Sequence, residues 1–325
     1  MSSMRKLIGF FVSITFVLGM ALLVLNRQSI IDEITLWQYQ PSSQIAEIAN
    51  RVKMSDFGKK MFYVSKPQIQ SASEFNKDCR RVEQGNAILG CYDQSAGEIY
   101  IYDVTNAELD GVKEVTAAHE MLHAAWKRLN SSERKRLSTL LEHAYDSVKT
   151  DKLAERMKYY DRAQPGTRAN ELHSILGTEF ANLGEELEGY YRRYFTDRSE
   201  VLRLHAQYRE KFESRENEAQ ELSKSLQSRK QKIDQDLSQY SADIADYNQR
   251  VADFNRRANS GDFSSQDDFS RQRRALQAEL SKLNSRRNNL NSEINSYNSG
   301  VLRLRELGVK IDELNKSLDS VEGAK

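Results

Sequence analysis

The sequence contains little that interrupts a helix. Only three prolines and 15 glycines occur in its 325 residues. Proline removes a backbone donor and clashes with the preceding turn, and glycine in a helix interior costs about 1 kcal/mol relative to alanine. A chain so poor in both residues is expected to be dominated by long helices.

The sequence also lacks an excess of either charge. Its 48 Lys and Arg residues and 47 Asp and Glu residues leave a formal net charge of +1. No block of basic residues of the kind that follows a phosphate backbone is present. We therefore do not expect nucleic acid as a partner.

Cysteine occurs only twice, at Cys79 and Cys91. This pair lacks the close C-x-x-C spacing of structural zinc sites. An even count favours one disulfide closing a short loop, which would contribute about 2–4 kcal/mol to stability. Two reduced and unrelated cysteines are the alternative that the sequence leaves open.

One long apolar run stands out from an otherwise polar sequence. Residues 7–25 carry no charge and are long enough to cross a bilayer as a helix. Two basic residues precede the run and one follows it, a small bias toward a cytoplasmic N-terminus. A cleaved signal peptide is the alternative. We expect residues 1–28 to be an uncleaved transmembrane signal anchor, so that the protein is single-pass and its remainder extracytoplasmic.

The rest of the chain divides into two parts by its patterning. Residues 29–198 mix short strands with helices, whereas residues 199–325 are polar, charged and almost free of breakers. In the first part we expect helices at about 43–54, 111–129, 131–148, 151–161, 168–182 and 185–195, and strands at 60–64, 87–92 and 98–102. A few strands followed by a cluster of helices predict an α+β domain.

The second part carries two runs of heptad spacing. Apolar residues alternate spacings of four and three over residues 233–254 and again over residues 276–304. A loop signal at residues 259–266 separates the runs. The pattern favours an antiparallel coiled-coil hairpin with arms of about 55–60 residues, each roughly 80–90 Å long. A parallel dimer between two chains is the alternative.

Histidine is scarce as well, and one motif uses two of the five. His119 and His123 lie four residues apart in the sequence HEMLH, with Glu120 after the first. On a helix both imidazoles lie on one face and reach one cation at about 2.0–2.1 Å. Glu120 is turned by about 100° and reaches a water on that ion instead. Zinc hydrolases use this arrangement, in which the glutamate is the general base.

A catalytic zinc ion needs a third protein ligand and one open position. The longer metzincin pattern is absent, because Trp126 and Leu129 stand where it has glycine and histidine. The ligand must therefore come from further along the chain. The predicted helix at residues 168–182 is the obvious source, with candidates Glu171, His173 and Glu179.

At this point the chain resembles the gluzincin metallopeptidases, the thermolysin-like class, over about residues 85–195. Members hold zinc with H-E-x-x-H and a glutamate on a later helix. The resemblance implies a zincin-like fold for residues 29–198 and a Zn²⁺ cofactor. It also implies the site residues His119, His123 and Glu171 as metal ligands and Glu120 as the general base.

The chain departs from the family at one position. Many gluzincins place an acidic residue four positions after the ligand glutamate, where Ile175 stands here. Glu179 therefore remains the alternative third ligand. The resemblance further implies that the strand at residues 98–102 is a sheet edge on which an extended substrate pairs. A second electrophile is expected among Tyr159, Tyr160, His143, His173, Tyr190 and Tyr191.

Together these patterns predict a membrane-anchored, extracytoplasmic zinc endopeptidase. It would hydrolyse peptide bonds of a peptide or protein substrate by a zinc-activated water. The N-terminal helix would contact the membrane, and the coiled coil would bind a protein partner or self-associate. The alternative is an envelope scaffold or adaptor that acts through its coiled coil and carries a structural or vestigial zinc site.

Overall fold

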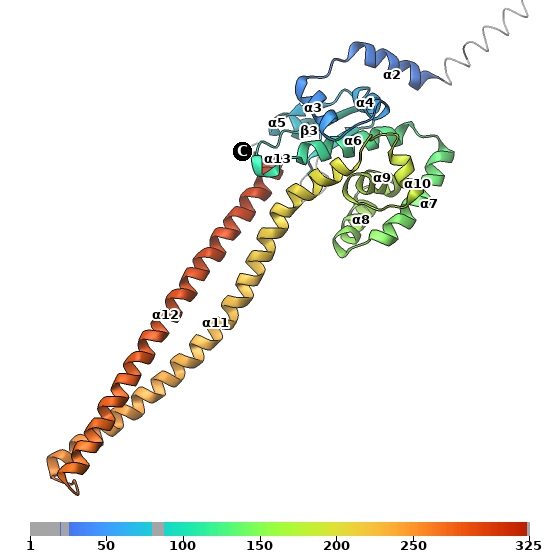
Figure 1. Cartoon of the computed structure of the whole chain (residues 1–325). Helices are drawn as coiled ribbons and strands as arrows, with labels where there is room; N and C mark the ends of the chain where they lie inside the picture. The colour runs from blue at the N-terminus through green and yellow to red at the C-terminus, as the bar shows by residue number, and fades with distance from the viewer. Residues whose placement is uncertain (1–19, 21–25, 80–87, 324–325) are drawn as a thin grey trace, which may run out of the picture. The chain divides into compact units, whose positions relative to one another are not determined.

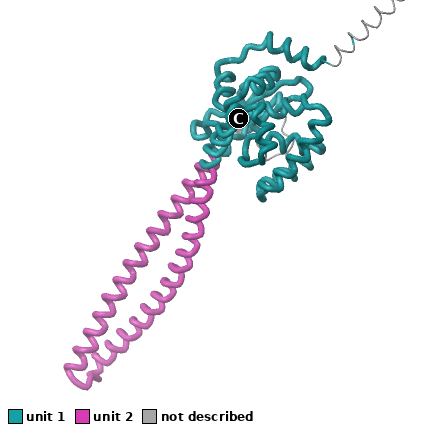
Figure 2. Tube along the Cα trace, turned by 45° about the vertical axis from the view of Figure 1, so that its right-hand side comes forward, with its two compact units in different colours: residues 1–211, 314–325 teal, residues 212–313 magenta. Residues whose placement is uncertain are grey.

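The computed structural model describes residues 20, 26–79 and 88–323. The chain divides into two compact units, coloured separately in Figure 2. The first unit comprises residues 1–211 and 314–325, and the second comprises residues 212–313. The structure is mostly helical, with a small three-stranded sheet and a long C-terminal helix pair (Figure 1). The predicted α+β class is therefore confirmed at this level.

Three strands form the sheet of the first unit in the order β1–β3–β2. β1 (Gln68–Gln70) runs parallel to β3 (Glu98–Tyr102), and β2 (Gly90–Asp93) runs antiparallel to it. The predicted hairpin of β2 and β3 is confirmed. The prediction that residues 98–102 form a sheet edge is wrong, because β1 pairs with the other side of β3. The edge strands are β1 and β2.

The strand predicted at residues 60–64 is also wrong, because this stretch lies in and just after α4 (Asp56–Tyr63). Ser55 caps that helix, and its Oγ accepts a hydrogen bond from the backbone of Gly58 at 3.0 Å. Gly58, Met61 and Phe62 are buried on one face. A helical period of 3.6 residues therefore buries the apolar side chains that a strand would have divided between two faces.

α6 (Val112–Arg128) is the central helix of this unit and packs against β2, β3 and several other helices. Ala117, Ala118 and Ala124 on it are fully buried. Small side chains at these positions allow neighbouring elements to approach closely. The other helices of this unit are α2 (Arg27–Gln38), α3 (Ser43–Arg51), α5 (Ala72–Asp78), α7 (Ser131–Val148), α8 (Asp151–Ala163), α9 (Arg168–Glu179), α10 (Glu185–Tyr191) and α13 (Ser320–Gly323).

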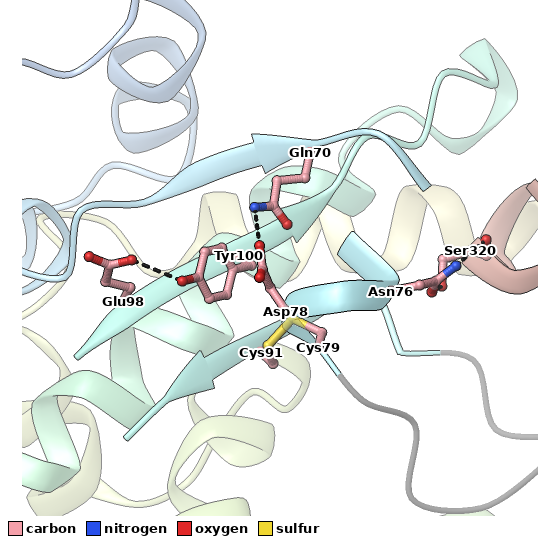
Figure 3. The surroundings of a disulfide bond; sticks show 8 residues. All are labelled: Gln70, Asn76, Asp78, Cys79, Cys91, Glu98, Tyr100 and Ser320. Atoms are coloured by element: carbon pink, nitrogen blue, oxygen red, sulfur yellow. Dashed lines mark hydrogen bonds between the residues drawn. A yellow bond between two sulfur atoms is a disulfide. The ribbon is translucent and has the colours of Figure 1, made fainter. Parts of the chain in front are cut away.

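A disulfide joins the end of α5 to an edge strand (Figure 3). Cys79, which follows the last residue of α5, is bonded to Cys91 in β2, and their Cα atoms lie 5.9 Å apart. Of the two alternatives that the sequence leaves open for the cysteines, the structure has the bonded one. β2 is therefore held covalently to a helix as well as by pairing with β3.

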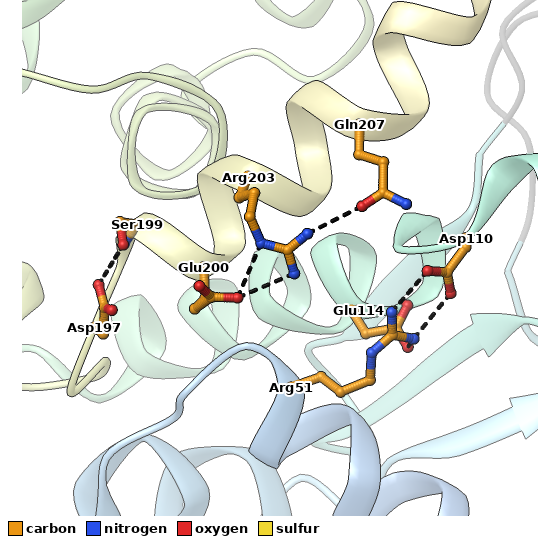
Figure 4. A network of polar contacts seen from close by, with 8 residues as sticks. All are labelled: Arg51, Asp110, Glu114, Asp197, Ser199, Glu200, Arg203 and Gln207. Atoms are coloured by element: carbon orange, nitrogen blue, oxygen red, sulfur yellow. Dashed lines mark hydrogen bonds and ion pairs between the residues drawn. The ribbon is translucent and has the colours of Figure 1, made fainter.

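An ion-pair network fixes the start of α6 (Figure 4). Arg51 of α3 donates to Asp110 at 2.8 and 3.0 Å and to Glu114 at 2.5 Å. Both carboxylates lie at the N-terminus of α6, where negative charge is favourable to the helix dipole. Gly111, which lies between Asp110 and the first residue of the helix, has a φ of 95° and serves as its N-cap. This network orients the helix that carries the histidine motif.

The second unit consists of a pair of long helices. α11 (Ser199–Ser260) and α12 (Gln266–Leu318) have 62 and 53 residues, and they continue beyond this unit at its boundaries. Arg286 pairs with Asp243, and Arg303 pairs with Glu218 at 2.9 Å, so the two helices of one chain lie side by side. Heptad-spaced leucines and isoleucines between them are buried: Leu226, Ile233, Leu283 and Leu290.

Among the described residues, no helix combines the length and the apolarity needed to cross a membrane. This finding corrects the expectation of a transmembrane signal anchor. It also removes the basis for the predicted single-pass membrane location, the extracytoplasmic domain and the membrane as a partner. Apart from Met20, the apolar run at residues 7–25 lies outside the described residues. The described helices that are long enough, α7, α11 and α12, are rich in charged side chains.

Candidate metal centre

α6 places the two histidines of the motif on one face. Their ring centroids are 4.8 Å apart, with the rings nearly perpendicular. The Nε2 atoms of His119 and His123 face each other at 3.1 Å. The four-residue spacing therefore brings two ring nitrogens to one point, as the helical period requires.

α9 brings a carboxylate to the same point. Oε2 of Glu171 lies 3.8 Å from Nε2 of His123. One ligand atom from each of His119, His123 and Glu171 lies within 4.8 Å of the other two. Two ligands of a tetrahedral zinc ion at 2.0–2.1 Å are separated by about 3.4 Å. The observed spacing therefore suits a single ion of this size.

The alternative ligand, Glu179, is not part of this cluster. It lies eight residues beyond Glu171 on α9, which corresponds to about 12 Å along a helix. Its carboxylate accepts two hydrogen bonds from Arg156, at 2.7 and 2.9 Å, and lies 3.6 Å from Nε2 of His205. Glu179 therefore serves a partly buried ion pair, and of the two candidate glutamates only Glu171 lies beside the histidines.

A neighbour of Glu171 orients one of the imidazoles. Oδ1 of Asn170 lies 3.0 Å from Nδ1 of His123. An amide oxygen only accepts, so this contact assigns the proton to Nδ1 and leaves the lone pair of Nε2 directed at the cluster. No pattern in the sequence predicts this role for Asn170, whose only sequence signal is its position next to the candidate ligand.

The protein environment affects the two imidazoles differently. Burial and the neighbouring His123 hold the pKa of His119 well below its usual value. Burial also lowers the pKa of His123, but the carboxylates of Glu171 and Glu120 outweigh burial and leave the pKa raised. His119 is therefore a neutral nitrogen donor at pH 7, the form that binds a cation.

Glu120 is buried beside the cluster. Burial raises the pKa of its carboxyl to about 7, against the opposing effects of His123 and of a hydrogen bond from the backbone N–H of Tyr92. The carboxylate also lies against Gly90, where an added Cβ would lie 3.0 Å from Oε1 of Glu120 and 2.5 Å from Thr116. Absence of a side chain at Gly90 therefore lets β2 approach Glu120 closely.

These residues open into one cavity of about 660 Å³. β2 lines it with Gly90, Cys91 and Tyr92, and α8 lines it with polar and aromatic side chains: Lys152, Glu155, Arg156, Tyr159 and Tyr160. His119, Glu120, His123 and Glu171 line it as well. The candidate ligand atoms are thus accessible from a cleft that has a strand as part of its wall.

The predicted candidates for a second electrophile separate into two groups. Tyr159 and Tyr160 line the cavity. His173, Tyr190 and Tyr191 do not, because they bond to one another in the core, and His143 is exposed on α7. Burial raises the pKa of Tyr160 to about 12, although a hydrogen bond and the charge of Arg156 oppose the rise.

The donor set fits zinc on chemical grounds. Two imidazole nitrogens and one carboxylate oxygen are ligands that zinc accepts, and a catalytic zinc site uses three protein ligands with one position open. Asn170 supplies the hydrogen-bond partner that a metal-bound imidazole requires on its other nitrogen. Arg156 and Asn170 were not predicted from the sequence, since their roles depend on contacts between helices.

Comparison with known proteins identifies no relative of this chain. No protein-family profile matches the chain, and neither a curated protein nor a solved structure shows significant similarity to it. The functional interpretation therefore depends on the residues and geometry of the site itself.

Proposed function

We propose that this chain is a zinc-dependent endopeptidase with a zincin-like catalytic domain. His119, His123 and Glu171 hold the metal, and Glu120 is the general base. The observation that carries the proposal is the convergence of two imidazoles and a carboxylate beside a buried glutamate in one cavity. The alternative ligand Glu179 is set aside because it is engaged by Arg156.

The arrangement of elements around the site supports a zincin-like fold. The H-E-x-x-H helix α6 packs against a small mixed sheet, and a second helix, α9, packs against α6 and carries the third ligand. The strand immediately before α6 belongs to this sheet. The gluzincin resemblance implies the same order of strand, motif helix and ligand helix.

Bound zinc would supply a Lewis acid and lower the pKa of water toward about 7. Glu120 would accept the proton of the attacking water and return it to the leaving amine. A carboxyl with a pKa of about 7 is suited to both transfers near neutral pH. The backbone N–H of Tyr92 holds this carboxylate in place against β2.

Tyr160 is the candidate for stabilising the charge that develops on the substrate oxygen. It lines the cavity, and its hydroxyl is paired with Arg156. An arginine only donates, so the phenol oxygen accepts that hydrogen bond and its own proton remains available to the substrate. Arg156 is in turn held by Glu179. A hydroxyl donor such as that of Tyr160, held in position before the substrate binds, contributes to transition-state stabilisation.

The substrate would bind as an extended strand along β2. The backbone of Tyr102 donates to the carbonyl of Leu89 at 2.8 Å, and Cys91 lies opposite Tyr100. Hydrogen-bonded and non-bonded pairs alternate along an antiparallel ladder, so the backbone groups of Gly90 and Tyr92 point away from β3. The N–H of Tyr92 is donated to Glu120, which leaves the backbone groups of Gly90 and the carbonyl of Tyr92 for a substrate. A peptide that pairs with this edge gains main-chain hydrogen bonds with little dependence on its sequence.

Metal analysis and one substitution test the proposal. The purified protein should contain one zinc per chain and cleave denatured casein in a chelator-sensitive manner. Glu120→Gln should keep the zinc and lose at least about a hundredfold in activity, because general-base catalysis contributes roughly 10²–10⁴. A Glu120→Gln protein that cleaves casein as fast as the parent would disprove the mechanism.

A scaffold function is the second candidate, and the helix pair favours it. Residues 212–313 form a compact unit of two paired helices with no part in the metal site. If a zinc-loaded protein cleaves neither casein nor a broad peptide library, this unit would carry the function and the metal would be structural.

A further inference from the structure

The C-terminal residues of the first unit are attached to α5 (Figure 3). α13 packs against this helix, and Ser320 is fully buried. Asn76 donates to the carbonyl of Ser320 at 2.9 Å, and the hydroxyl of Ser320 donates back to Oδ1 of Asn76 at 2.6 Å. Nearby, Asn106 donates to Ser317 at 3.0 Å. Residues 244 positions apart in sequence are thus joined by a reciprocal pair of hydrogen bonds.

α5 is in turn connected to every strand of the sheet. Its Phe75 is fully buried and packs against β3. Asp78 accepts a hydrogen bond of 2.7 Å from Gln70 of β1. Cys79, one helical turn beyond Asn76, forms the disulfide to Cys91 of β2. A change in the position of α5 is therefore transmitted covalently to β2.

Apart from the disulfide, β2 is held by its pairing with β3 and by packing against α6. It is four residues long and, in the described part of the chain, pairs only with β3. Its outer edge faces away from that partner. Cys91 itself lines the cavity, while the neighbouring Gly90 lies against Glu120. Small displacements of this strand would therefore move the backbone groups that a substrate pairs with.

We propose that Ser320, Asn76 and the disulfide act together as positioning residues for β2, so that the C-terminal segment of the chain sets the affinity for extended peptides. This inference rests on the proposed peptidase function. Ser320 holds α5 through its hydrogen bonds to Asn76, and α5 in turn holds the proposed substrate-binding strand β2 through the Cys79–Cys91 disulfide. Of these residues, Cys91 lines the cavity beside the proposed metal ligands, whereas Ser320, Asn76 and Cys79 do not line it.

A double-mutant cycle tests the transmission in the full-length, zinc-loaded protein. The variants are Ser320→Ala, Cys79→Ala with Cys91→Ala, and all three together. Ser299→Ala is the matched control, because this exposed serine of α12 bonds only to its own helix. KM and kcat are measured with the best-cleaved extended peptide from a casein digest and with a blocked dipeptide.

Ser320→Ala should raise KM for the extended peptide about fivefold, since the hydrogen bond from the Ser320 hydroxyl to Asn76 is lost. Its kcat for the dipeptide should stay within about twofold of the parent, because the short substrate does not pair along β2. Without the disulfide, adding Ser320→Ala should have almost no further effect on KM. Equal losses for both substrates, additive effects, or an unchanged KM would each overturn the proposal.

Hydrogen exchange supplies a readout that does not depend on peptidase activity. Ser320→Ala should accelerate exchange at the amides of residues 90–93 and leave those of α9 unchanged. Faster exchange confined to α5 and α13 would overturn the proposal. This test uses Ser320→Ala alone, so it remains decisive if the variants without the disulfide fail to fold. Failure of the parent to cleave any peptide would count against the proposed function, whereas this exchange experiment would still decide whether α5 positions β2.

Discussion

The amide oxygen of Asn170 lies 3.0 Å from Nδ1 of His123, on the opposite side of the imidazole ring from the cluster. The residue that orients one ligand is thus the immediate neighbour of another, Glu171. One turn of α9 therefore supplies both the oxygen of a proposed metal ligand and the hydrogen bond that selects the tautomer of a second proposed ligand, His123.

Asn170→Ala should weaken zinc binding without removing any ligand. Loss of an outer hydrogen bond to a metal-bound histidine typically lowers affinity by roughly 10–100-fold. Competition with a chromogenic chelator at pH 7.5 measures the dissociation constant. Asn170→Asp is the matched control and should retain tight binding, because a carboxylate also accepts from Nδ1. An Asn170→Ala protein with the affinity of the parent would show that this contact has no role in metal binding.

Glu171 and Glu179 should respond differently to substitution by glutamine. Glu171→Gln should lower zinc affinity sharply, because a neutral amide is a poorer zinc ligand than a carboxylate. Glu179→Gln should keep one zinc per chain but lose about 1–3 kcal/mol of stability, since Arg156 loses its charged partner in a partly buried site. Metal content and thermal unfolding of both variants make the comparison. If Glu179→Gln lost its zinc and Glu171→Gln kept it, the ligand assignment would be reversed.

Local signals in the sequence were sufficient for most of the helices. Asn130 and Glu133 have capping-box spacing, and in the structure they form that capping box at the start of α7. The heptad runs likewise predicted a paired helical region, because side-chain periodicity is a local property. Short apolar runs carry no such information, which is why residues 60–64 were predicted as a strand although they belong to a helix and its C-cap.

Pairing between distant segments was not predictable. β1 has only three residues, two of them glutamine, and its pairing with β3 joins Gln68 to Tyr100 across 32 positions. Without β1, β3 could be taken for the edge strand. At the site, the H-E-x-x-H spacing predicted the two imidazoles, but the pairing of Glu179 with Arg156 is a contact between helices. The choice between Glu171 and Glu179 therefore needed the structure.

Gly90→Ala should separate the close packing of β2 from metal binding. An added Cβ would lie 2.5 Å from Thr116 and 2.9 Å from the side chain of Glu120, so the strand must shift. We expect a loss of about 1–3 kcal/mol in stability from overpacking and a larger proportional loss of peptidase activity, with zinc content unchanged. Chemical unfolding and a casein assay measure both effects.

Gly189→Ala is the control for this glycine substitution. Gly189 lies within α10, and the nearest atom to its added Cβ is the flexible end of Arg192 at 3.3 Å. Alanine favours the helix relative to glycine, so stability should stay the same or rise slightly. If Gly90→Ala and Gly189→Ala behaved alike, close approach of β2 to Glu120 would not matter for the proposed peptidase activity.

The ion pair at the start of α6 should make part of the stability depend on pH. The hydrogen bond from Arg51 lowers the pKa of Asp110, and burial opposes this effect. A carboxyl with a lowered folded-state pKa stabilises the fold above its unfolded pKa of about 4, and this contribution is lost as the pH falls through the folded-state pKa. Asp110 is half exposed, so the contribution is that of a surface pair, about 0.2–1 kcal/mol.

Asp110→Asn should therefore lower the melting temperature by roughly 1–3 °C at pH 7 and have almost no effect near pH 2.5. Thermal unfolding followed by circular dichroism across this pH range measures the difference between variant and parent. Glu47→Gln, at an exposed position of α3, controls for the loss of one negative charge. A difference that stays constant from pH 7 to pH 2.5 would mean that the carboxylate charge of Asp110 contributes nothing, and that Arg51 orients α6 through Glu114 alone.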